Sequence, residues 1–294
     1  MLDFRTPTLG DRERITSFVS ASGQLGCDVT FTNTYLWRDH YDIRVAFTDG
    51  AYYKCYFTDG VLTGYTFPLT AGDPKKAIDA ILADASERGV KPEIGLLNDH
   101  NAALIRELYG ERVTITPDRD SYDYLYEREA LAALSGKKYH AKRNHLSKFY
   151  RTYTDVSVEE ICERNFGDVI DVCARWQEQG GDTGELGIIR DALGHFDVLG
   201  MFGILLYVDG RAVAMSMGSR ISDEVCDVNF EKAVGIDEAY AVINQEFARR
   251  FDSFRFLNRE EDMGLEGLRK SKLSYHPAAM VQKSTAVFAI ENGK

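Results

Sequence analysis

The chain has 294 residues and a net charge of −11, with 35 Lys and Arg against 46 Asp and Glu. This length suits two domains, and the acidic balance excludes general adhesion to nucleic acid or to anionic membranes as the main property of the surface. No apolar run approaches the roughly 20 residues of a membrane span, and the N-terminus lacks the basic start and apolar block of a secretory signal, so we expect a cytoplasmic protein.

The cysteines and histidines give no sign of a disulfide framework or a metal site. The five cysteines are odd in number, widely spaced, and include no CxxC pair, and the six histidines never fall in a metal-ligand spacing. We therefore expect reduced thiols and no bound metal.

The first part of the chain is predicted to form a helix, an antiparallel meander and alternating helices and strands. Two Asp-Gly turns, at 49–50 and 59–60, separate the strands of the meander. After the first helix we expect a loop rich in Gly, Thr and Asn that ends in the aromatic cluster of Phe31, Tyr35, Leu36 and Trp37. The expected elements are a helix at 8–22, strands at 43–47, 51–57 and 65–69, a helix at 74–88, a strand at 93–97, a helix at 100–109, and strands at 113–115 and 122–126.

The second part repeats this order of elements. The expected elements are helices at 159–180 and 186–195, strands at 201–208, 211–219 and 224–232, a helix at 237–250, a strand at 254–257, a helix at 264–272 and a last strand at 280–290. The repetition indicates a duplicated α+β unit. We predict an N-terminal domain at 1–133, a basic connecting segment at 134–155, and a C-terminal domain at 156–294 that carries the active cleft.

The stretch 256–277, FLNREEDMGLEGLRKSKLSYHP, is the densest in charged side chains. Helix capping accounts for part of it, and we predict Asp262 as the cap of the helix. Capping does not account for Asn258, Arg259 and Glu260, which leave the carboxyl end of a strand, where open α/β sheets usually place their ligands. These three side chains are therefore predicted to form one wall of a cleft.

Polar side chains alternate along the predicted strand 225–233. Alternation with a period of two places Asp227, Asn229 and Glu231 on one face. A solvent-facing edge strand would show the same pattern, whereas a central strand would turn these groups into a wet cleft. In the second case Glu231 is the candidate general base, and Asp227 and Asn229 bind or orient an amine.

A basic segment at 137–151 contains six Lys or Arg and two His without a single acid. One interpretation is a solvated helix that links two domains. The other is that Lys142, Arg143, Asn144 and His145 bind the phosphates of tRNA, of a nucleotide or of a lipid headgroup, with aromatic neighbours available for stacking. The sequence leaves both interpretations open.

The order of elements resembles that of the N-acetyltransferase-like fold. Three segments, LSGKKYHAKRNHLSKF at 134–149, VNFEKAVGIDEAYAVINQEF at 228–247 and the stretch at 256–277, resemble soluble bacterial proteins grouped with the C-terminal catalytic domain of phosphatidylglycerol lysyltransferase. The resemblance covers nearly the whole chain. It implies an α+β fold of two tandem acyl-CoA N-acyltransferase-like domains, each a mixed, mainly antiparallel sheet flanked by helices.

The resemblance also implies a reaction. Membrane-bound members of the group move an amino acid from aminoacyl-tRNA to a lipid headgroup, but their lipid-facing transmembrane half has no counterpart in this sequence. We therefore expect an acyl or aminoacyl transferase that acts on an amine or hydroxyl acceptor, with aminoacyl-tRNA or acyl-CoA as donor. The alternatives are a non-catalytic module that binds an anionic ligand and an acetyl-CoA-dependent N-acetyltransferase.

The turn at 232–238 disfavours acetyl-CoA. Acetyltransferases of this fold usually hold pyrophosphate on a basic, glycine-rich turn before a helix, and this turn has one glycine and two acids. The transferase hypothesis then assigns the catalytic residues as Glu231, Asp227 and Arg259. The predicted substrate-binding residues, expected to lie near the same cleft, are Asn229, Asn258, Glu260, Lys272, Tyr275, Lys142, Arg143, Asn144 and His145.

Overall fold

A computed structural model describes residues 1–182 and 184–289. Contacts divide the chain into two compact units. The first unit comprises residues 1–123, 261–265 and 281–289, and the second comprises 124–260 and 266–280. These units are defined by contacts between residues alone. The domain boundaries at 133 and 155, which rest on the repeated order of elements in the sequence, stay a prediction.

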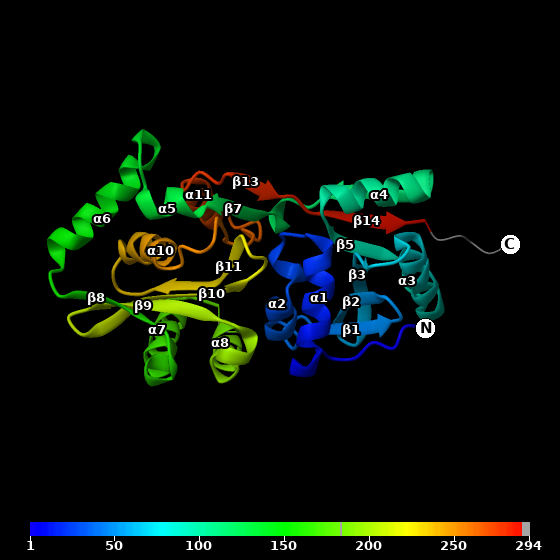
Figure 1. The fold of residues 1–294 in the computed structure, drawn as a ribbon, viewed down its shortest axis with the longest axis horizontal. Helices are drawn as coiled ribbons and strands as arrows, with labels where there is room; N and C mark the ends of the chain where they lie inside the picture. Colours follow the sequence, from blue (N-terminus) through cyan, green and yellow to red (C-terminus); the bar gives the residue numbers. More distant parts are fainter. Residues whose placement is uncertain (183, 290–294) are drawn as a thin grey trace. The chain divides into compact units, whose positions relative to one another are not determined.

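The first unit is a mixed sheet with helices. Its helices are α1 (Arg12–Ser22), α2 (Phe31–Leu36), α3 (Pro74–Arg88) and α4 (Asp99–Tyr109). Its strands are β1 (Ile43–Thr48), β2 (Ala51–Thr58), β3 (Val61–Thr66), β4 (Leu69–Thr70), β5 (Glu93–Leu97), β6 (Val113–Pro117) and β14 (Ser284–Phe288). The strand order is β1-β2-β3-β5-β14-β6, with β4 paired to β2, and the pair β3–β5 is parallel. Figure 1 labels β1, β2, β3, β5 and β14 of this sheet.

Local signals explain why helix α3 begins and ends where the sequence predicts. Pro74 occupies the first turn, and the Asp73 carboxylate caps the helix by accepting a hydrogen bond from the N–H of Lys75 at 2.9 Å. Gly89, with φ of 68°, ends the helix.

The second unit is a larger helix–sheet–helix assembly. Its helices are α5 (Arg128–Ala133), α6 (His140–Thr152), α7 (Phe166–Glu178), α8 (Glu185–Gly194), α9 (Phe196–Leu199), α10 (Ala239–Arg250) and α11 (Glu266–Leu273). Its strands are β7 (Asp123–Glu127), β8 (Val156–Glu160), β9 (Phe202–Val208), β10 (Arg211–Arg220), β11 (Val225–Ala233), β12 (Phe256–Asn258) and β13 (Ala279–Val281). The strand order is β13-β7-β12-β11-β10-β9-β8.

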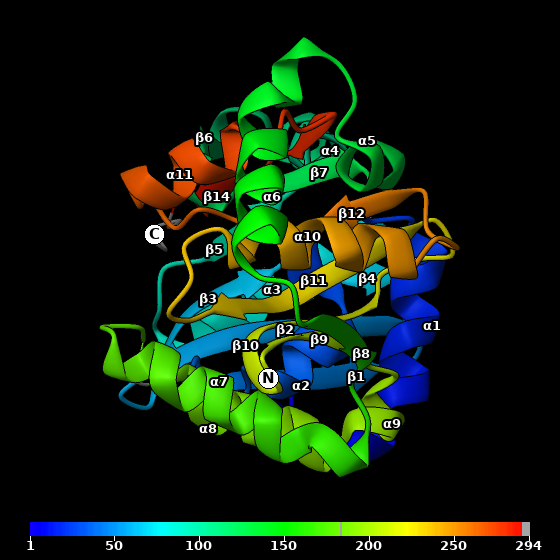
Figure 2. The ribbon, with the colours of Figure 1, turned by 90° about the vertical axis from the view of Figure 1, so that its left-hand side faces the viewer.

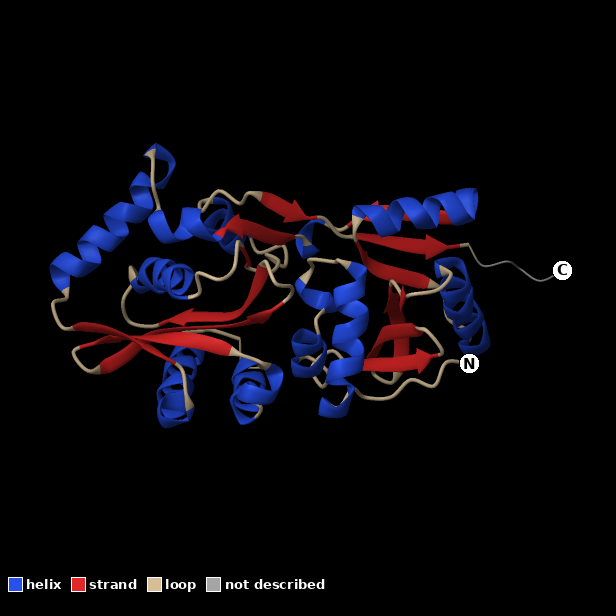
Figure 3. Ribbon diagram, viewed as in Figure 1, coloured by secondary structure: helices blue, strands red, loops and turns tan. Residues whose placement is uncertain are grey.

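Helices cover both faces of this sheet. Helix α10 packs on one face and helices α7 and α8 lie on the other (Figure 3). Helix α6, which contains most of the basic segment, packs across α10 (Figure 2). The basic segment is therefore a helix of the second unit.

A parallel strand pair in the second unit opens partway along its length. Strands β11 and β12 pair from Val225 with Phe256 to Asp227 with Asn258, and β12 ends there while β11 continues to Ala233. Beyond this point the two strands no longer share hydrogen bonds. Side chains from the second half of β11 and from the loop after β12 therefore border a gap in the sheet.

Several elements differ from the sequence-based prediction because they depend on distant partners. Residues 31–36 form α2, which Thr30 caps, where a loop was predicted. The helix predicted at 159–180 begins only at Phe166, because 156–160 pairs with β9 as strand β8. The strand predicted at 280–290 is two strands, β13 and β14, and residue 290 lies outside the described residues.

Candidate active site

The alternation predicted for β11 is interrupted by a β-bulge. Across the β10–β11 pair, Ser216 lies opposite Glu231 and Ser219 lies opposite Asp227, so three steps along β10 correspond to four along β11. Because cross-strand partners share a face and neighbours alternate, the extra residue puts Glu231 and Asp227 on opposite faces. The prediction that Asp227, Asn229 and Glu231 line one face is wrong for this reason.

Glu231 forms an ion pair with Arg259 across the gap between β11 and β12. The Arg259 Nη2 atom donates to Oε1 of Glu231 at 2.7 Å, and the two side chains are only 13% and 10% exposed. Burial disfavours the charged guanidinium, but the Glu231 carboxylate together with Tyr126 and Tyr275 outweighs this and raises the pKa of Arg259. The pair is a charged bridge at the point where the parallel strands separate.

Asn244 of helix α10 completes this bridge. With its amide oxygen turned toward Arg259, as the surrounding donors require, Asn244 accepts hydrogen bonds from Nη1 at 3.1 Å and from Nε at 3.3 Å. Sequence reasoning gave Asn244 no role. The available signal was an amide directly after the apolar run 241–243 of the helix, because a buried amide needs hydrogen-bond partners.

Tyr275, which follows α11, carries two cations beside its ring. Lys142 Nζ lies 3.7 Å from the ring centre and the Arg259 guanidinium carbon lies 5.1 Å from it. Burial and the positive charge of Arg259 lower the pKa of Lys142 to about 8, although Glu231 opposes the shift. Burial raises the pKa of Tyr275 to about 12. Lys142, Arg259, Glu231 and Tyr275 therefore form one cluster, which we call the cleft cluster.

Lys272 supports the loop that carries Arg259. Its Nζ atom donates to the backbone oxygens of Arg259 at 2.6 Å and of Glu260 at 3.1 Å. Glu260 adopts a left-handed φ of 53°, and its N–H donates to Oδ1 of Asn258 at 2.8 Å. A non-glycine residue in this conformation needs such support. Lys272 and Asn258 thus help to fix the backbone next to Arg259.

Asp227, Asn229 and Asn258 lie together on the other face of the sheet. The Asn229 Nδ2 atom donates to Oδ2 of Asp227 at 3.0 Å, and Asn258 is the register partner of Asp227 on β12. All three side chains are buried. The geometry separates them from the cleft cluster, and their assigned roles in catalysis and binding stay predictions.

The remaining predicted residues of α6 differ in their surroundings. Arg143 donates to the backbone oxygens of Leu134 at 2.6 Å and Gly136 at 2.7 Å, and so holds the turn before the helix. Asn144 and His145 are exposed. Whether Arg143, Asn144 and His145 bind a substrate stays a prediction.

Asp262, the predicted helix cap, precedes α11 by four residues. Its carboxylate accepts a hydrogen bond from the N–H of Gly264 at 3.0 Å and pairs with Arg119 at 3.2 Å. Both of these contacts lie within the first unit. Asp262 therefore orders the turn before the helix.

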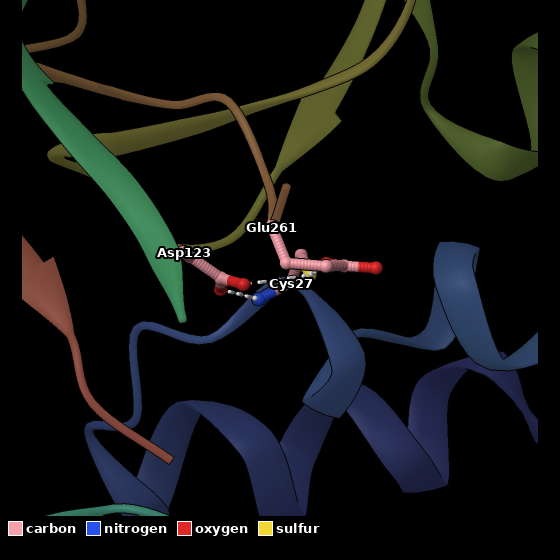
Figure 4. Close-up of side chains that lie close together, drawn as sticks. All are labelled: Cys27, Asp123 and Glu261. Carbon is pink, nitrogen blue, oxygen red and sulfur yellow. Dashed lines mark hydrogen bonds between the residues drawn. The ribbon is translucent and has the colours of Figure 1, made fainter. Parts of the chain in front are cut away.

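The first unit contains a second charged cluster, formed by Cys27, Asp28, Asp123, Glu261 and Lys283. Figure 4 shows Cys27, Asp123 and Glu261, whose ligand-type atoms lie within 4.8 Å of one another, as metal ligands do. Lys283 Nζ, however, lies 2.6 Å from Asp123 and 2.8 Å from Asp28. The ammonium already supplies the positive charge that these carboxylates require, so a metal ion would have to displace it.

Two mixed sheets flanked by helices, each with a parallel strand pair, define a tandem acyl-CoA N-acyltransferase-like fold. The crystal structure of FemX shares this fold, with a TM-score of 0.61 and 10% identity over 98% of each chain. The family model described as phosphatidylglycerol lysyltransferase, C-terminal, matches residues 20–287. The chain belongs to this family, which confirms the resemblance and the fold class inferred from the sequence.

Solved structures share this fold. A conserved protein of unknown function from Bacteroides thetaiotaomicron is 36% identical, with a TM-score of 0.91, over 98% of this chain and 100% of that one. L-PGS from Bacillus licheniformis is 14% identical, with a TM-score of 0.66, over 97% of this chain and 93% of that one. No curated protein matches the sequence. None of the helices in the described residues is long and apolar enough to cross a membrane.

Proposed function

We propose that the second unit is an acyl or aminoacyl transferase that passes an acyl unit to an amine or hydroxyl acceptor. Family membership and fold support a transferase. The description of the matching family names a lysyltransferase, which favours an aminoacyl unit over other acyl groups.

The observation that carries the proposal is the Glu231–Arg259 ion pair across the gap between β11 and β12. Acyl transfer requires a fixed positive group near the carbonyl oxygen, where negative charge develops, and a base for the proton of the acceptor. Arg259 supplies the positive group and Glu231 the base. Asn244 holds the guanidinium in place through its amide oxygen.

The donor is proposed to be aminoacyl-tRNA, with acyl-CoA as the second choice. The basic residues of 137–151 offer contacts to tRNA phosphates. At the start of α10, where an acyltransferase would hold pyrophosphate, Glu238 is paired with Lys148. A pyrophosphate group would have to displace this carboxylate, which disfavours acyl-CoA.

A donor screen with a matched pair of variants tests the proposal. The purified chain is incubated with labelled aminoacyl-tRNAs and acyl-CoAs and with a panel of amines and hydroxyl compounds. We expect acyl transfer by the wild type and a rate lower by about 10²–10⁴ for Glu231→Gln. Glu246→Gln, on the same helix as Asn244 but paired with Arg249, should leave the rate unchanged.

Two results would contradict the proposal. Equal rates for wild type and Glu231→Gln would remove the cleft cluster from the reaction. Binding of an anionic donor by the wild type without transfer to any acceptor would indicate a non-catalytic binding module instead.

A further inference from the structure

We infer that Lys142 is the general acid of the proposed transfer, giving a proton to the oxygen or sulfur of the donor that leaves the acyl carbon. This inference rests on the proposed function. Arg259 polarises the carbonyl and Glu231 accepts a proton in the proposed function. The inference adds Lys142 as a third catalytic residue, which donates a proton.

The position of Lys142 suits this role. Its side chain reaches from α6 to the Tyr275 ring, which Arg259 also contacts, and Arg259 in turn bonds to Glu231. In the described part of the chain, no carboxylate lies within ion-pair distance of Lys142 Nζ. Its protons are therefore not committed to a carboxylate partner.

The neighbouring cations of the second unit are already committed. Lys148 donates to Glu238, Lys272 donates to two backbone oxygens, and Arg143 donates to two others. Arg259 keeps its proton at all accessible pH values, because a guanidinium is effectively never deprotonated. Among these groups, Lys142 combines a free ammonium with a place in the cleft cluster.

The surroundings of Lys142 also tune its acidity. The charged and titratable groups that face it are Arg259, Glu231 and Tyr275, and burial together with Arg259 lowers its pKa to about 8. Such an ammonium is about nine-tenths protonated at pH 7, yet roughly 300-fold more acidic than an ordinary lysine. Proton transfer is most efficient when the pKa of the acid lies near the working pH.

The reaction then balances without any further reactant. The acceptor nitrogen or oxygen forms a bond to the acyl carbon, and its proton passes to Glu231. The bond between the acyl carbon and the leaving oxygen or sulfur breaks, its electron pair goes to the leaving atom, and Lys142 protonates that atom. Lys142 becomes a neutral amine, and it regains a proton as Glu231 releases one to water.

The choice of leaving group tests this assignment. An aminoacyl ester of a tRNA ribose leaves as a strongly basic alkoxide and needs an acid, whereas a nitrophenyl ester leaves as a stable anion and does not. For Lys142→Met we expect a 10²–10³-fold slower transfer from aminoacyl-tRNA and a change of about threefold or less with the nitrophenyl ester. Lys270→Met, which removes an exposed lysine of α11, should change neither rate.

Tyr275 is the competing proton donor, since its hydroxyl group belongs to the same cluster. A selective loss with aminoacyl-tRNA in Tyr275→Phe, without such a loss in Lys142→Met, would overturn the assignment of Lys142. Equal losses with both donors in Lys142→Met would also overturn it, because they would indicate a binding or structural role.

A measurement without substrate separates this inference from the proposed function. In a titration of carbon-13-labelled lysines by NMR, the signal that is missing from Lys142→Met should titrate with a pKa near 8. A value of 10 or above would overturn the inference alone. Absence of transfer by the wild type with every donor would overturn the proposed function and the inference with it.

Discussion

The cluster around Lys283 in the first unit and the cleft cluster in the second unit both contain a lysine and at least one carboxylate, but they differ in the ratio of acids to cations. In the first unit, Lys283 lies between the carboxylates of Asp28 and Asp123, and its side chain is only 4% exposed. In the cleft cluster, the single carboxylate of Glu231 faces two cations, Arg259 and Lys142. In the first cluster the acids outnumber the ammonium of Lys283, whereas in the second the cations outnumber the acid.

The pKa shifts of the two lysines show the consequence. Burial lowers the pKa of Lys283, but Asp123 and Asp28 outweigh it and raise the pKa well above the ordinary value. Burial and Arg259 lower the pKa of Lys142 to about 8. The first lysine is held permanently charged, which suits a structural role, and the second can exchange its proton near neutral pH, which suits chemistry.

The largest effect is expected from Lys283→Met. Removing Lys283 takes away an ion-pair partner of both Asp28 and Asp123 at a buried site, which costs about 3–5 kcal/mol. Urea unfolding should show this loss, while Lys91→Met, at an exposed position of the same unit, should not. An unchanged free energy of unfolding in Lys283→Met would mean that the cluster does not stabilise the fold.

The next largest effect is expected from Arg259→Lys. The variant keeps the positive charge but loses the planar fork that bonds to both Glu231 and Asn244. We expect the transfer rate to fall by about 10²–10³. A loss of stability without a change in rate would mean that the cleft cluster stabilises the fold and takes no part in the reaction. It would then have the same role as the cluster around Lys283.

A smaller effect is expected in the pH dependence of stability. Between pH 8 and 10.5 the unfolded chain binds more protons at Lys142 than the folded chain, so stability rises with pH across this window. Relative to Lys142→Met, the wild type should gain about 1 kcal/mol from pH 7.5 to pH 10.5, after allowance for solvent screening. If the free energy of unfolding depended on pH in the same way in both proteins, the pKa of Lys142 would not be shifted in the folded protein.

The smallest effect is expected from Cys27→Ser. The Cys27 thiol donates to Asp123 at 3.4 Å, and a serine hydroxyl can replace this donor. We expect a change within about 1 kcal/mol, measured by thermal unfolding. A loss as large as that of Lys283→Met would show that the thiol, and not the ammonium, is the main partner of Asp123.

Local signals allowed much of the fold to be predicted. The Asp-Gly turn at 49–50 predicted the first hairpin, and Pro74 and Gly89 predicted the ends of α3. The strand predicted at 65–69 begins earlier, because β3 starts at Val61 directly after the second Asp-Gly turn. Strand β14, in contrast, pairs with β5 and β6, more than 160 residues away in sequence. No local pattern shows such a partner, so the prediction gave the strand but not its sheet.

For the candidate site, too, the sequence indicated single positions but not all of their partners. Proximity to a strand end predicted the position of Arg259, and the structure pairs this residue with Glu231, which the sequence had placed in the same cleft. The bulge in β11 was not predictable, because it depends on the register with β10, and it moves Asp227 to the other face. Lys142 could be identified only as part of a basic segment, because its partners lie more than 80 residues away.

The most direct test of the central claim is a single-turnover measurement with labelled aminoacyl-tRNA and an amine acceptor. It compares the wild type with Glu231→Gln after the affinity of each for the donor has been determined. We predict transfer by the wild type, and a rate at least about 100-fold lower in the variant at unchanged donor affinity. Equal transfer rates for the two proteins would contradict the claim that the cleft cluster is the active site.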